Sequence, residues 1–324
     1  KLFKYNYNGE MHHFKTKSLD LLVTPNHRMV VDQAVSGKRK FVEARDFDFN
    51  NQRIPKQGIW HGKEKERFIL PSIEFIKYGR QGKTPYKVIR ESLKIRMDDW
   101  LKFFGFWLAE GSTDNENIAQ SHGYRTVITQ IKKKTKQEIR RVLDVLPFDY
   151  MEEKNNFVIC NKQLWTYLRQ FGGKYEKYIP RSVKNLSERQ LRILFNWMVK
   201  GDGHIRKTTG QVNYWTASEK LADDLQEIIL KLGWLGTITT QLPKTSVIKG
   251  RKIRSNIIYC LGVQKAKHYR LREEAVKKVI YKGWVYCCEV ENHTVFVRRN
   301  GKVCWCGNSI GVVTINLPRL GHLS

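Results

Sequence analysis

The sequence predicts an α+β chain with short strands at its N-terminal end and a duplicated helix-and-strand region in its middle. Residues 1–31 hold runs of aromatic and β-branched residues between turn residues, a composition typical of small all-β structure. From residue 98 onward, apolar residues recur at helical spacing, and the order helix, strand, helix appears twice. These observations predict a middle region with pseudo-two-fold symmetry.

The N-terminal part is expected to contain strands followed by an irregular stretch. A strand over residues 2–7 is predicted to end at Asn8-Gly9, a dipeptide typical of hairpin turns, before a second run that ends at Val23. Residues 32–95 mix glycine, proline and basic residues with aromatic residues and show little periodicity. This composition fits a DNA-contacting arm and a solvated linker equally well.

The first central helix is predicted between Asp98, a suitable N-cap residue, and Gly111, a suitable residue after the helix end. Its apolar face consists of Trp100, Phe103, Phe104, Trp107 and Leu108. A strand, a helix, a strand and a helix are expected next, over residues 127–130, 135–146, 157–159 and 161–172.

The second central helix is predicted to begin at a capping box formed by Ser187 and Gln190 and to stop at Gly203. Its apolar face consists of Leu191, Leu194, Phe195 and Met198. A strand, a helix and two strands are expected next, over residues 212–215, 218–232, 237–240 and 257–263. This order repeats that of the first half.

Each central helix is predicted to end in an acidic residue, Glu110 in the first and Asp202 in the second, and each acid is followed by glycine. A carboxylate is unfavourable there, because the C-terminal end of a helix already carries partial negative charge. A bound cation would stabilise both carboxylates. The residues directly before the acids are small, Ala109 and Gly201, so the two helix ends can approach closely. We therefore predict that the two carboxylates meet on the symmetry axis.

The charge of the chain favours a polyanionic partner. It has 59 lysine and arginine residues against 31 aspartate and glutamate residues, which gives a formal net charge of +28. Nucleic acid is the expected partner, because lysine and arginine neutralise its phosphates. The alternative, the ion-pair surface of a heat-adapted protein, would need acids in similar number, and these are lacking.

The sequence predicts a soluble, cytoplasmic protein. No stretch has the length of apolar residues needed to span a bilayer, and Lys1, with neither a leader nor a methionine, indicates the start of a fragment. Four of the six cysteines lie near the C-terminal end without paired C-x-x-C spacing, so a structural zinc site is disfavoured.

The two acid-containing segments, residues 103–111 and 195–203, resemble the paired motifs of the LAGLIDADG homing endonucleases. Residues 95–101 are similar to that family's lead-in to the first motif, and residues 216–222 to the helix after the second. Residues 177–180, Lys-Tyr-Ile-Pro, resemble a segment found between the motifs in the intein-borne branch. The resemblance implies a monomer that cleaves double-stranded DNA at a long pseudo-palindromic site, which two sheets would hold as a basic saddle.

Mg²⁺ is the cofactor that the resemblance implies. Glu110 and Asp202 would bind it, together with the glycines that follow them, Gly111 and Gly203. The ions would activate water and stabilise the leaving oxygen on each DNA strand.

Lys177 would, by the same resemblance, position or polarise the attacking water or stabilise charge at phosphorus. Its counterpart in the second half is left open between Lys244 and Lys265. Trp197 and Lys200 stand where the family has small and acidic residues, so we expect a looser or offset helix interface there. The main alternative is therefore a DNA-binding or splicing element whose endonuclease is inactive. A free-standing RNA maturase is a third, disfavoured interpretation.

Both ends of the chain resemble the splicing segments of inteins, which have the Hint fold. Residues 24–27 resemble the T-x-x-H block, in which Thr24 and His27 would polarise the amide at the N-terminal splice junction. The block with the first splicing nucleophile, which precedes T-x-x-H in inteins, is missing. The chain is therefore expected to be truncated and unable to perform the first acyl shift.

Residues 285–297 and 301–309 resemble the C-terminal intein blocks. In them the side-chain amide of Asn308 would cyclise onto its own carbonyl, and the hydroxyl of Ser309 would accept the acyl group. The residues implied to assist are Cys287 and His293. Gly307 replaces the usual penultimate histidine, so another group must aid cyclisation, or the step is slow.

These resemblances divide the chain into five segments. Residues 309–324 are similar to an anaerobic ribonucleoside-triphosphate reductase and are interpreted as host extein. The other segments are an incomplete N-terminal Hint segment, a linker or DNA-recognition arm, the LAGLIDADG region with its two subdomains, and a C-terminal Hint segment, over residues 1–31, 32–95, 96–280 (96–183 and 184–280) and 281–308. The predicted fold is thus a duplicated αββαββα endonuclease inserted in an all-β domain.

Overall fold

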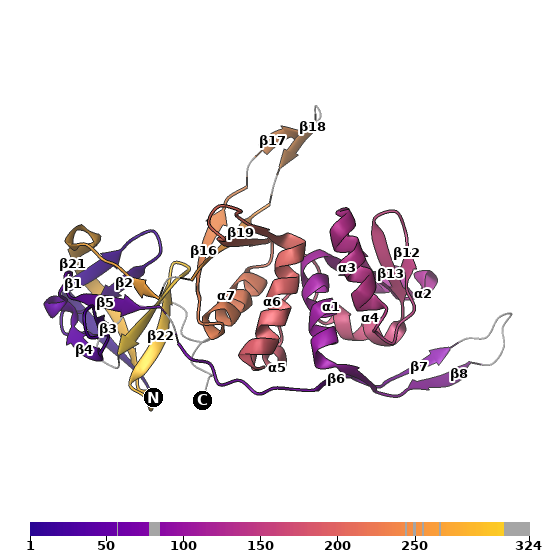
Figure 1. Cartoon of the computed structure of the whole chain (residues 1–324), viewed down its shortest axis with the longest axis horizontal. Coiled ribbons are helices and arrows are strands. Elements are labelled where there is room, and N and C mark those ends of the chain that lie inside the picture. The colour runs from indigo at the N-terminus through magenta and orange to yellow at the C-terminus, as the bar shows by residue number, and fades with distance from the viewer. Residues whose placement is uncertain are drawn as a thin grey trace. The chain divides into compact units, whose positions relative to one another are not determined.

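The computed structural model describes residues 1–56, 58–77, 85–243, 245–248, 251–254, 256–265 and 267–307. The chain forms two compact units, which Figure 1 colours by position in the sequence. The first unit comprises Lys1–Ile59, Gly233–Thr239 and the described residues from Leu261 onward, and the second comprises Trp60–Leu232 and Thr240–Cys260. Among the described residues, no helix combines the length and the apolar character needed to cross a membrane.

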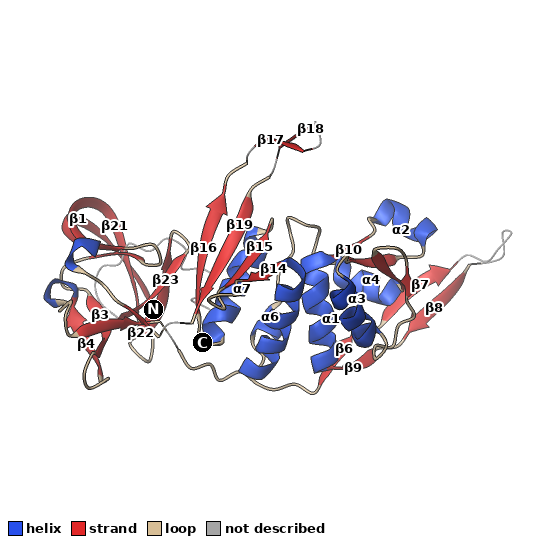
Figure 2. Cartoon of the chain, turned by 45° about the horizontal axis from the view of Figure 1, so that its top comes forward, coloured by secondary structure: helices blue, strands red, loops and turns tan. Residues whose placement is uncertain are grey.

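The described residues of the first unit form strands, and two short 3-10 helices, Ala44–Asp46 and Glu273–Ala275, lie in its connections (Figure 2). One sheet has the order β2-β1-β21, and a second has the order β20-β5-β3-β23-β22 with β4 paired to β3. The strands are β1 (Leu2–Lys15), β2 (Asp20–Val23), β3 (Arg28–Gln33), β4 (Arg39–Glu43), β5 (Gln52–Pro55), β20 (His268–Tyr269), β21 (Val276–Cys288), β22 (Thr294–Arg299) and β23 (Lys302–Gly307). The expected all-β structure of residues 1–31 is confirmed.

The predicted hairpin turn at Asn8-Gly9 is wrong, because β1 runs through it without a break. Asn8 lies opposite Lys282 and Gly9 opposite Tyr281 in the antiparallel ladder with β21. A partner strand as long as β1 pairs the backbone of Asn8-Gly9 within the ladder. This distant pairing overrides the local turn preference.

The first unit extends beyond the segments assigned to it from the sequence. It reaches Ile59, includes Gly233–Thr239 and resumes at Leu261, and β3, β4, β5, β20 and β21 all pair within its sheets. Its N-terminal and C-terminal parts are hydrogen-bonded to each other, since the backbone N–H of Lys56 donates to the carbonyl of Lys267 over 2.9 Å.

The second unit contains two halves with the same strand order. The first half has the sheet β10-β11-β13-β12 and the second half has β14-β15-β19-β16. The first half contains α1 (Met97–Glu110), β10 (Gly111–Thr113), α2 (Glu116–His122), β11 (Arg125–Thr129), α3 (Lys133–Leu143), β12 (Met151–Glu152), β13 (Asn156–Cys160) and α4 (Lys162–Arg169). The second half contains α6 (Glu188–Asp202), β14 (Gly203–Ile205), β15 (Val212–Thr216) and α7 (Glu219–Lys231), with α5 (Arg181–Lys184) before it. Its sheet is completed by β16 (Leu235–Gln241) and β19 (Ile258–Gln264), of which residues 235–239 and 261–264 are counted in the first unit. The predicted internal duplication is confirmed.

The described residues between 67 and 96 form paired strands and not the irregular stretch expected from the sequence. β6 (Arg67–Leu70) pairs with β9 (Leu93–Arg96), and β7 (Ile73–Lys77) pairs with β8 (Tyr86–Arg90). The amide of Gln163 on α4 donates to two main-chain carbonyls at the base of this hairpin, those of Pro71 and Glu91. A further hairpin, β17 (Thr245–Ile248) with β18 (Arg251–Arg254), lies between β16 and β19 in the sequence.

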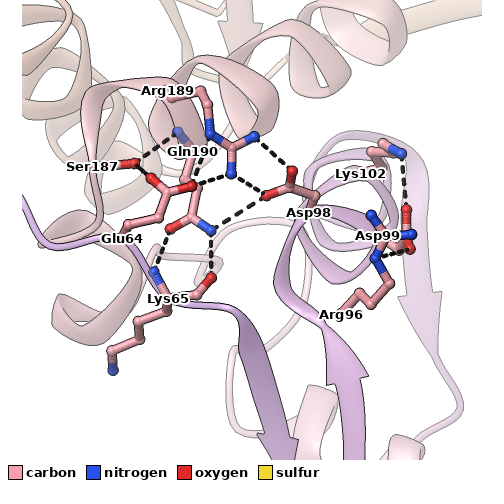
Figure 3. Close-up of polar contacts among 9 residues, drawn as sticks. All are labelled: Glu64, Lys65, Arg96, Asp98, Asp99, Lys102, Ser187, Arg189 and Gln190. Atoms are coloured by element: carbon pink, nitrogen blue, oxygen red, sulfur yellow. Dashed lines mark hydrogen bonds and ion pairs between the residues drawn. The ribbon is translucent and has the colours of Figure 1, made fainter.

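The N-terminal ends of α1 and α6 are joined by a polar network (Figure 3). Asp98 is not the N-cap of α1, which is Arg96; its carboxylate instead accepts hydrogen bonds from Arg189 at 2.6 and 2.9 Å. Arg189 also pairs with Glu64. The network ties the first turns of both central helices to the segment before β6.

The predicted capping box at Ser187 is present on one side only. Ser187 is the N-cap of α6 and its hydroxyl accepts from the backbone N–H of Gln190 over 3.2 Å. The side chain of Gln190 does not reach back to Ser187 but bonds the carbonyl of Lys65 at 2.6 Å and Asp98 at 3.3 Å (Figure 3). A tertiary contact therefore replaces the local one.

The interface between α1 and α6 is close at Trp197, where a looser or offset packing was expected. A Cβ atom placed on Gly105 would lie 3.2 Å from Cβ of Trp197 and 2.8 Å from the carbonyl oxygen of Leu194. Gly105 thus leaves the room that the larger residue needs. Lys200 places its Nζ 3.0 Å from the Glu138 carboxylate.

Gly201 is where the two helices approach most tightly near their ends, since a Cβ atom placed there would lie 2.5 Å from Cβ of Ala109. In an open helix Gly→Ala stabilises by about 1 kcal/mol. Here we expect Gly201→Ala to destabilise the protein by about 2 kcal/mol, because the added methyl group overpacks the interface. Urea denaturation measures this change, and Ala109→Gly in the same chain should restore most of the loss. Stabilisation by Gly201→Ala alone would contradict the close approach.

Candidate functional site

The two central helices lie side by side (Figure 1) and end at matching positions. Glu110 is the last residue of α1 and Asp202 the last residue of α6. In both cases the glycine that follows donates its N–H back into the last turn, from Gly111 to the carbonyl of Trp107 and from Gly203 to the carbonyl of Val199. Each glycine then begins a strand, so the sequence prediction that the acids end two equivalent helices is confirmed.

A cavity of about 800 Å³ contains both acids. Its walls come from the end of α1 and the residues after it, the segment 172–177 and the end of β15. The charged side chains that line it include Glu110, Asp202, Lys174, Lys177 and Arg169. The structure therefore brings together the two acids and the lysine that were singled out from the sequence.

Burial disfavours the ionised form of both carboxyl groups, and at Asp202 the charge of Glu110 adds to this effect. The pKa of Asp202 is raised to about 7, first by burial and then by the charge of Glu110, while Lys177, Lys174 and Lys132 oppose the rise. Burial also raises the pKa of Glu110, against the charges of Lys132 and Lys177. The site thus holds two carboxylates whose charges a cation would stabilise.

Lys177 is buried and makes hydrogen bonds only to main-chain carbonyls among its described contacts. Its Nζ donates to Trp107 over 2.7 Å, to Leu108 over 3.0 Å and to Gly111 over 2.7 Å. Burial lowers its pKa to about 8, and the charges of Asp202 and Glu110 oppose this decrease. The three bonds leave no N–H of the ammonium group for a water molecule.

Sequence reasoning missed three residues near the acids. Lys132 and Lys174 are exposed lysines whose charges act on Asp202. Tyr214 on β15 lies opposite Gly203 and is fully buried, and within the described part of the chain its hydroxyl has no hydrogen-bond partner. The position of Tyr214 follows from the β14–β15 register, which the sequence pattern of a three-residue strand does not reveal.

The donors at the site fit a hard divalent cation. Carboxylate and main-chain carbonyl oxygens are the ligands that Mg²⁺ prefers, and Glu110, Asp202 and Gly111 all line the cavity. Gly203 directly follows Asp202 at the start of β14. Within the described ranges, no group of three or more histidine, cysteine, aspartate or glutamate residues is arranged to hold a metal ion. A cation here would bind the two acids, carbonyl oxygens and water, and the carboxylates of Asp114 and Glu176 also line the cavity.

The predicted splicing residues lie in the first unit. Thr24 and His27 are both buried in the turn between β2 and β3, where the N–H of His27 donates to the carbonyl of Thr24 over 3.0 Å. Burial lowers the pKa of His27 to about 3, so its imidazole is neutral at neutral pH. Cys287 lies on β21 opposite Phe3, and His293 adopts a positive φ of 53° just before β22.

The two predicted splicing segments meet at one end of the larger sheet. Cys306 on β23 pairs with Met29 on β3, and Gly307 pairs with Thr294. A Cβ atom placed on Gly307 would lie 2.7 Å from the carbonyl oxygen of Arg28, the residue after His27.

The cysteines of this unit also gather near that end. The thiol of Cys304, burial, and then the charges of Cys288 and Cys287 raise the pKa of Cys306. The six cysteines, all of which lie among the described residues, form no disulfide bond. Asn308, Ser309 and the predicted extein 309–324 lie outside the described residues. Lys244 also lies outside them, and Lys265 stacks on Trp234 in the first unit.

One family model matches part of the chain. Residues 190–267 are similar to the LAGLIDADG-like domain family. Its matched region begins in α6 and includes Asp202, β14, β15 and α7.

Two curated proteins are similar to the chain in sequence, and their names describe two different functions. The chain is 30% identical over 358 residues to the "DNA-directed RNA polymerase subunit beta C-terminal section" of Stigeoclonium helveticum, covering 94% of this chain and 32% of that protein. It is 34% identical over 248 residues to the "ATP-dependent Clp protease proteolytic subunit" of Chlamydomonas moewusii, covering 74% of this chain and 24% of that protein. The chain thus spans a third or less of the length of these relatives.

Among solved structures, the chain is similar to I-DmoI in complex with DNA and Mn, at 14% sequence identity and a TM-score of 0.33. The similarity covers 52% of this chain and 89% of that one.

Proposed function

We propose that this chain is an intein that carries a LAGLIDADG homing endonuclease, a hydrolase that cleaves double-stranded DNA at a specific site. The observation that carries the proposal is the pair Glu110 and Asp202, which end two equivalent helices and line one cavity. The family match over residues 190–267 includes the second of these acids. The duplicated sheets and helices supply the first at the equivalent position.

Mg²⁺ is the proposed cofactor, because carboxylate and phosphate oxygens are its preferred ligands. Glu110 and Asp202 would hold it, with the carbonyl groups of Gly111 and Gly203 beside them. When bound, the cation supplies an activated water and stabilises charge on the phosphate and the leaving oxygen. The buried carboxylates keep it in place, and the basic side chains of Lys132 and Lys174 attract the DNA phosphates.

Double-stranded DNA is the proposed partner of the two equivalent sheets. The net charge of +28 favours a polyanion, and two sheets of the same strand order match two similar half-sites. One chain carries both halves, so we propose that it binds a long pseudo-palindromic site as a monomer.

Protein splicing is the proposed activity of the first unit in the full-length protein. Segments from both ends of the chain form one all-β unit, and the second unit, Trp60–Leu232 and Thr240–Cys260, lies between these segments in the sequence. The relatives, which carry unrelated names and match over a third or less of their length, favour an inserted element over a host enzyme. The proposed splicing residues are Thr24, His27, Cys287, His293, Asn308 and Ser309.

The proposed host is an anaerobic ribonucleoside-triphosphate reductase, with residues 309–324 as its extein. This assignment rests on the resemblance of the C-terminal sequence, and a cytoplasmic location is proposed from the sequence as a whole.

A cleavage assay tests the nuclease. The purified chain with Mg²⁺ should cut both strands of a DNA fragment that carries the uninterrupted host gene, at one position, and EDTA should prevent this. The matched control is the same gene fragment interrupted by the intein-coding sequence, which should stay intact. Binding of the uninterrupted fragment without cleavage in Mg²⁺ or Mn²⁺ would instead establish the alternative, a splicing element with an inactive endonuclease.

A further inference from the structure

Lys177 links the two halves of the second unit through its side chain and its backbone. Its ammonium group binds three carbonyls at the end of α1, in the first half, at 2.7 to 3.0 Å. Its own carbonyl accepts a hydrogen bond from Ser218 Oγ over 2.7 Å, and Ser218 is the N-cap of α7 in the second half. One residue therefore fixes the end of α1 relative to α7.

The segment that carries Lys177 is held firmly on α7. The backbone N–H of Ile179 donates to Asp224 Oδ2 over 2.9 Å, and Lys184 Nζ donates to the other oxygen of the same carboxylate over 2.9 Å. Lys184 also pairs with Glu227 over 2.7 Å. These buried contacts restrict the segment, so the position of the Lys177 ammonium group is set by the fold and not by its own flexible side chain.

The ammonium group occupies the place where α1 is most negative. The last carbonyls of a helix have no partner within it and carry partial negative charge, here next to the carboxylate of Glu110. Lys177 satisfies three carbonyls of this region, including that of Gly111. A divalent cation bound to the same Gly111 oxygen would lie close to the ammonium charge, and this repulsion weakens binding.

We propose that Lys177 is a positioning residue, a resident cation that caps α1 and orients Glu110, so that a divalent cation binds first on the Asp202 side of the centre. The order of cation binding rests on the proposed function, whereas the capping role does not. The proposal replaces the expectation that Lys177 polarises the attacking water, because its three N–H groups are already donated to the protein. The two acids then differ in their affinity for a cation, although they end equivalent helices.

Lys177→Met tests the proposal, because methionine keeps the length of the side chain and removes its charge and donors. Without a metal, the melting temperature of the variant should fall by roughly 5 to 10 °C, since buried carbonyls lose their partner. Calorimetric titration with Mg²⁺ or Mn²⁺ should show tighter binding, by roughly tenfold, because the competing charge is gone. The matched control is Lys174→Met, which removes an exposed lysine of the same cavity and should change the melting temperature by less than about 2 °C.

A measurement on the unaltered chain keeps the proposal testable if Lys177→Met does not fold. The ¹⁵N resonance of the Lys177 ammonium group, assigned by its loss in Lys177→Arg, should exchange slowly with water because its protons are donated within the protein. Rapid exchange, or a Lys177→Met variant with unchanged stability and unchanged cation affinity, would overturn the proposal. If the unaltered chain binds neither cation, that result contradicts the proposed function. The capping role of Lys177 is then tested by the melting temperatures alone.

Discussion

Glu110→Gln and Asp202→Asn are each expected to reduce DNA cleavage by at least about a thousandfold while DNA binding stays nearly unchanged. Each substitution keeps the shape of the side chain and removes one of the two carboxylates that end the central helices. The reason for the large effect is that the described residues offer no group of three or more histidine, cysteine, aspartate or glutamate residues that could hold a metal ion without them. A neutral amide oxygen is a much weaker ligand than a carboxylate.

Supercoiled plasmid carrying the target measures this effect, because it separates nicking from double-strand cleavage. If both acids share the cations of one centre, each variant should lose both products. Glu188→Gln is a suitable control, since Glu188 lies on the same helix as Asp202 but in its first turn and exposed to solvent. Cleavage at near-normal rates by Glu110→Gln or Asp202→Asn would refute the assignment of the centre, and unchanged binding excludes a folding defect.

The duplicated fold was predictable because local patterns and tertiary packing agree in it. Ser187 caps α6 through the expected side-chain bond, and Gly111 and Gly203 end α1 and α6 as predicted. The apolar faces of both helices also point inward, and residues such as Trp100 and Leu194 are fully buried. At these positions the local structure is determined by residues that are close together in the sequence.

The remaining differences arise where a distant partner decides the structure. Asn8-Gly9 has a turn sequence, but β21 pairs with it from the other end of the chain. Asp98 has a capping side chain, but Arg189 binds it from the second helix. Strands β7 and β8 have little sequence signal, and their hairpin is fixed by Gln163. No local pattern contains these partners.

The candidate site also combines features that the local sequence predicts with features that depend on distant residues. The two acids were predictable because each lies at the end of a patterned helix and the pattern occurs twice. Lys177 was identified by a short motif, but its role depends on three carbonyls of a helix about 70 residues away in the chain, which only the structure brings to it. Tyr214 lies near Asp202 because β15 pairs with β14. Lys132 is the N-cap residue of α3, and its charge acts on Asp202. No local sequence pattern predicts either position.

Asp202→Asn is expected to stabilise the metal-free protein at pH 8 while it abolishes cleavage. The pKa of Asp202 rises from 3.8 to about 7 in the folded chain, mainly through burial, so the folded state disfavours the ionised carboxyl group. In the unaltered protein this lowers stability progressively as pH rises from about 4 to 7, and the loss is complete above pH 7. After an allowance for partial exposure, we expect a gain of about 1 to 3 kcal/mol for the asparagine variant at pH 8 and almost none at pH 4.

Urea denaturation in EDTA at the two pH values measures this difference. Asp98→Asn is the matched control of opposite sign: Arg189 holds the pKa of Asp98 below its usual range, so removing that charge should destabilise the protein at pH 8. Added Mg²⁺ should then stabilise the unaltered chain, because binding to the folded state offsets the repulsion of its two carboxylates, and should have little effect on Asp202→Asn. An asparagine variant less stable than the unaltered protein at pH 8 would show that Asp202 is held by a favourable partner. A favourable partner would remove the physical reason for a cation at this centre, because a cation is required only where the protein itself does not stabilise the charge of the carboxylates.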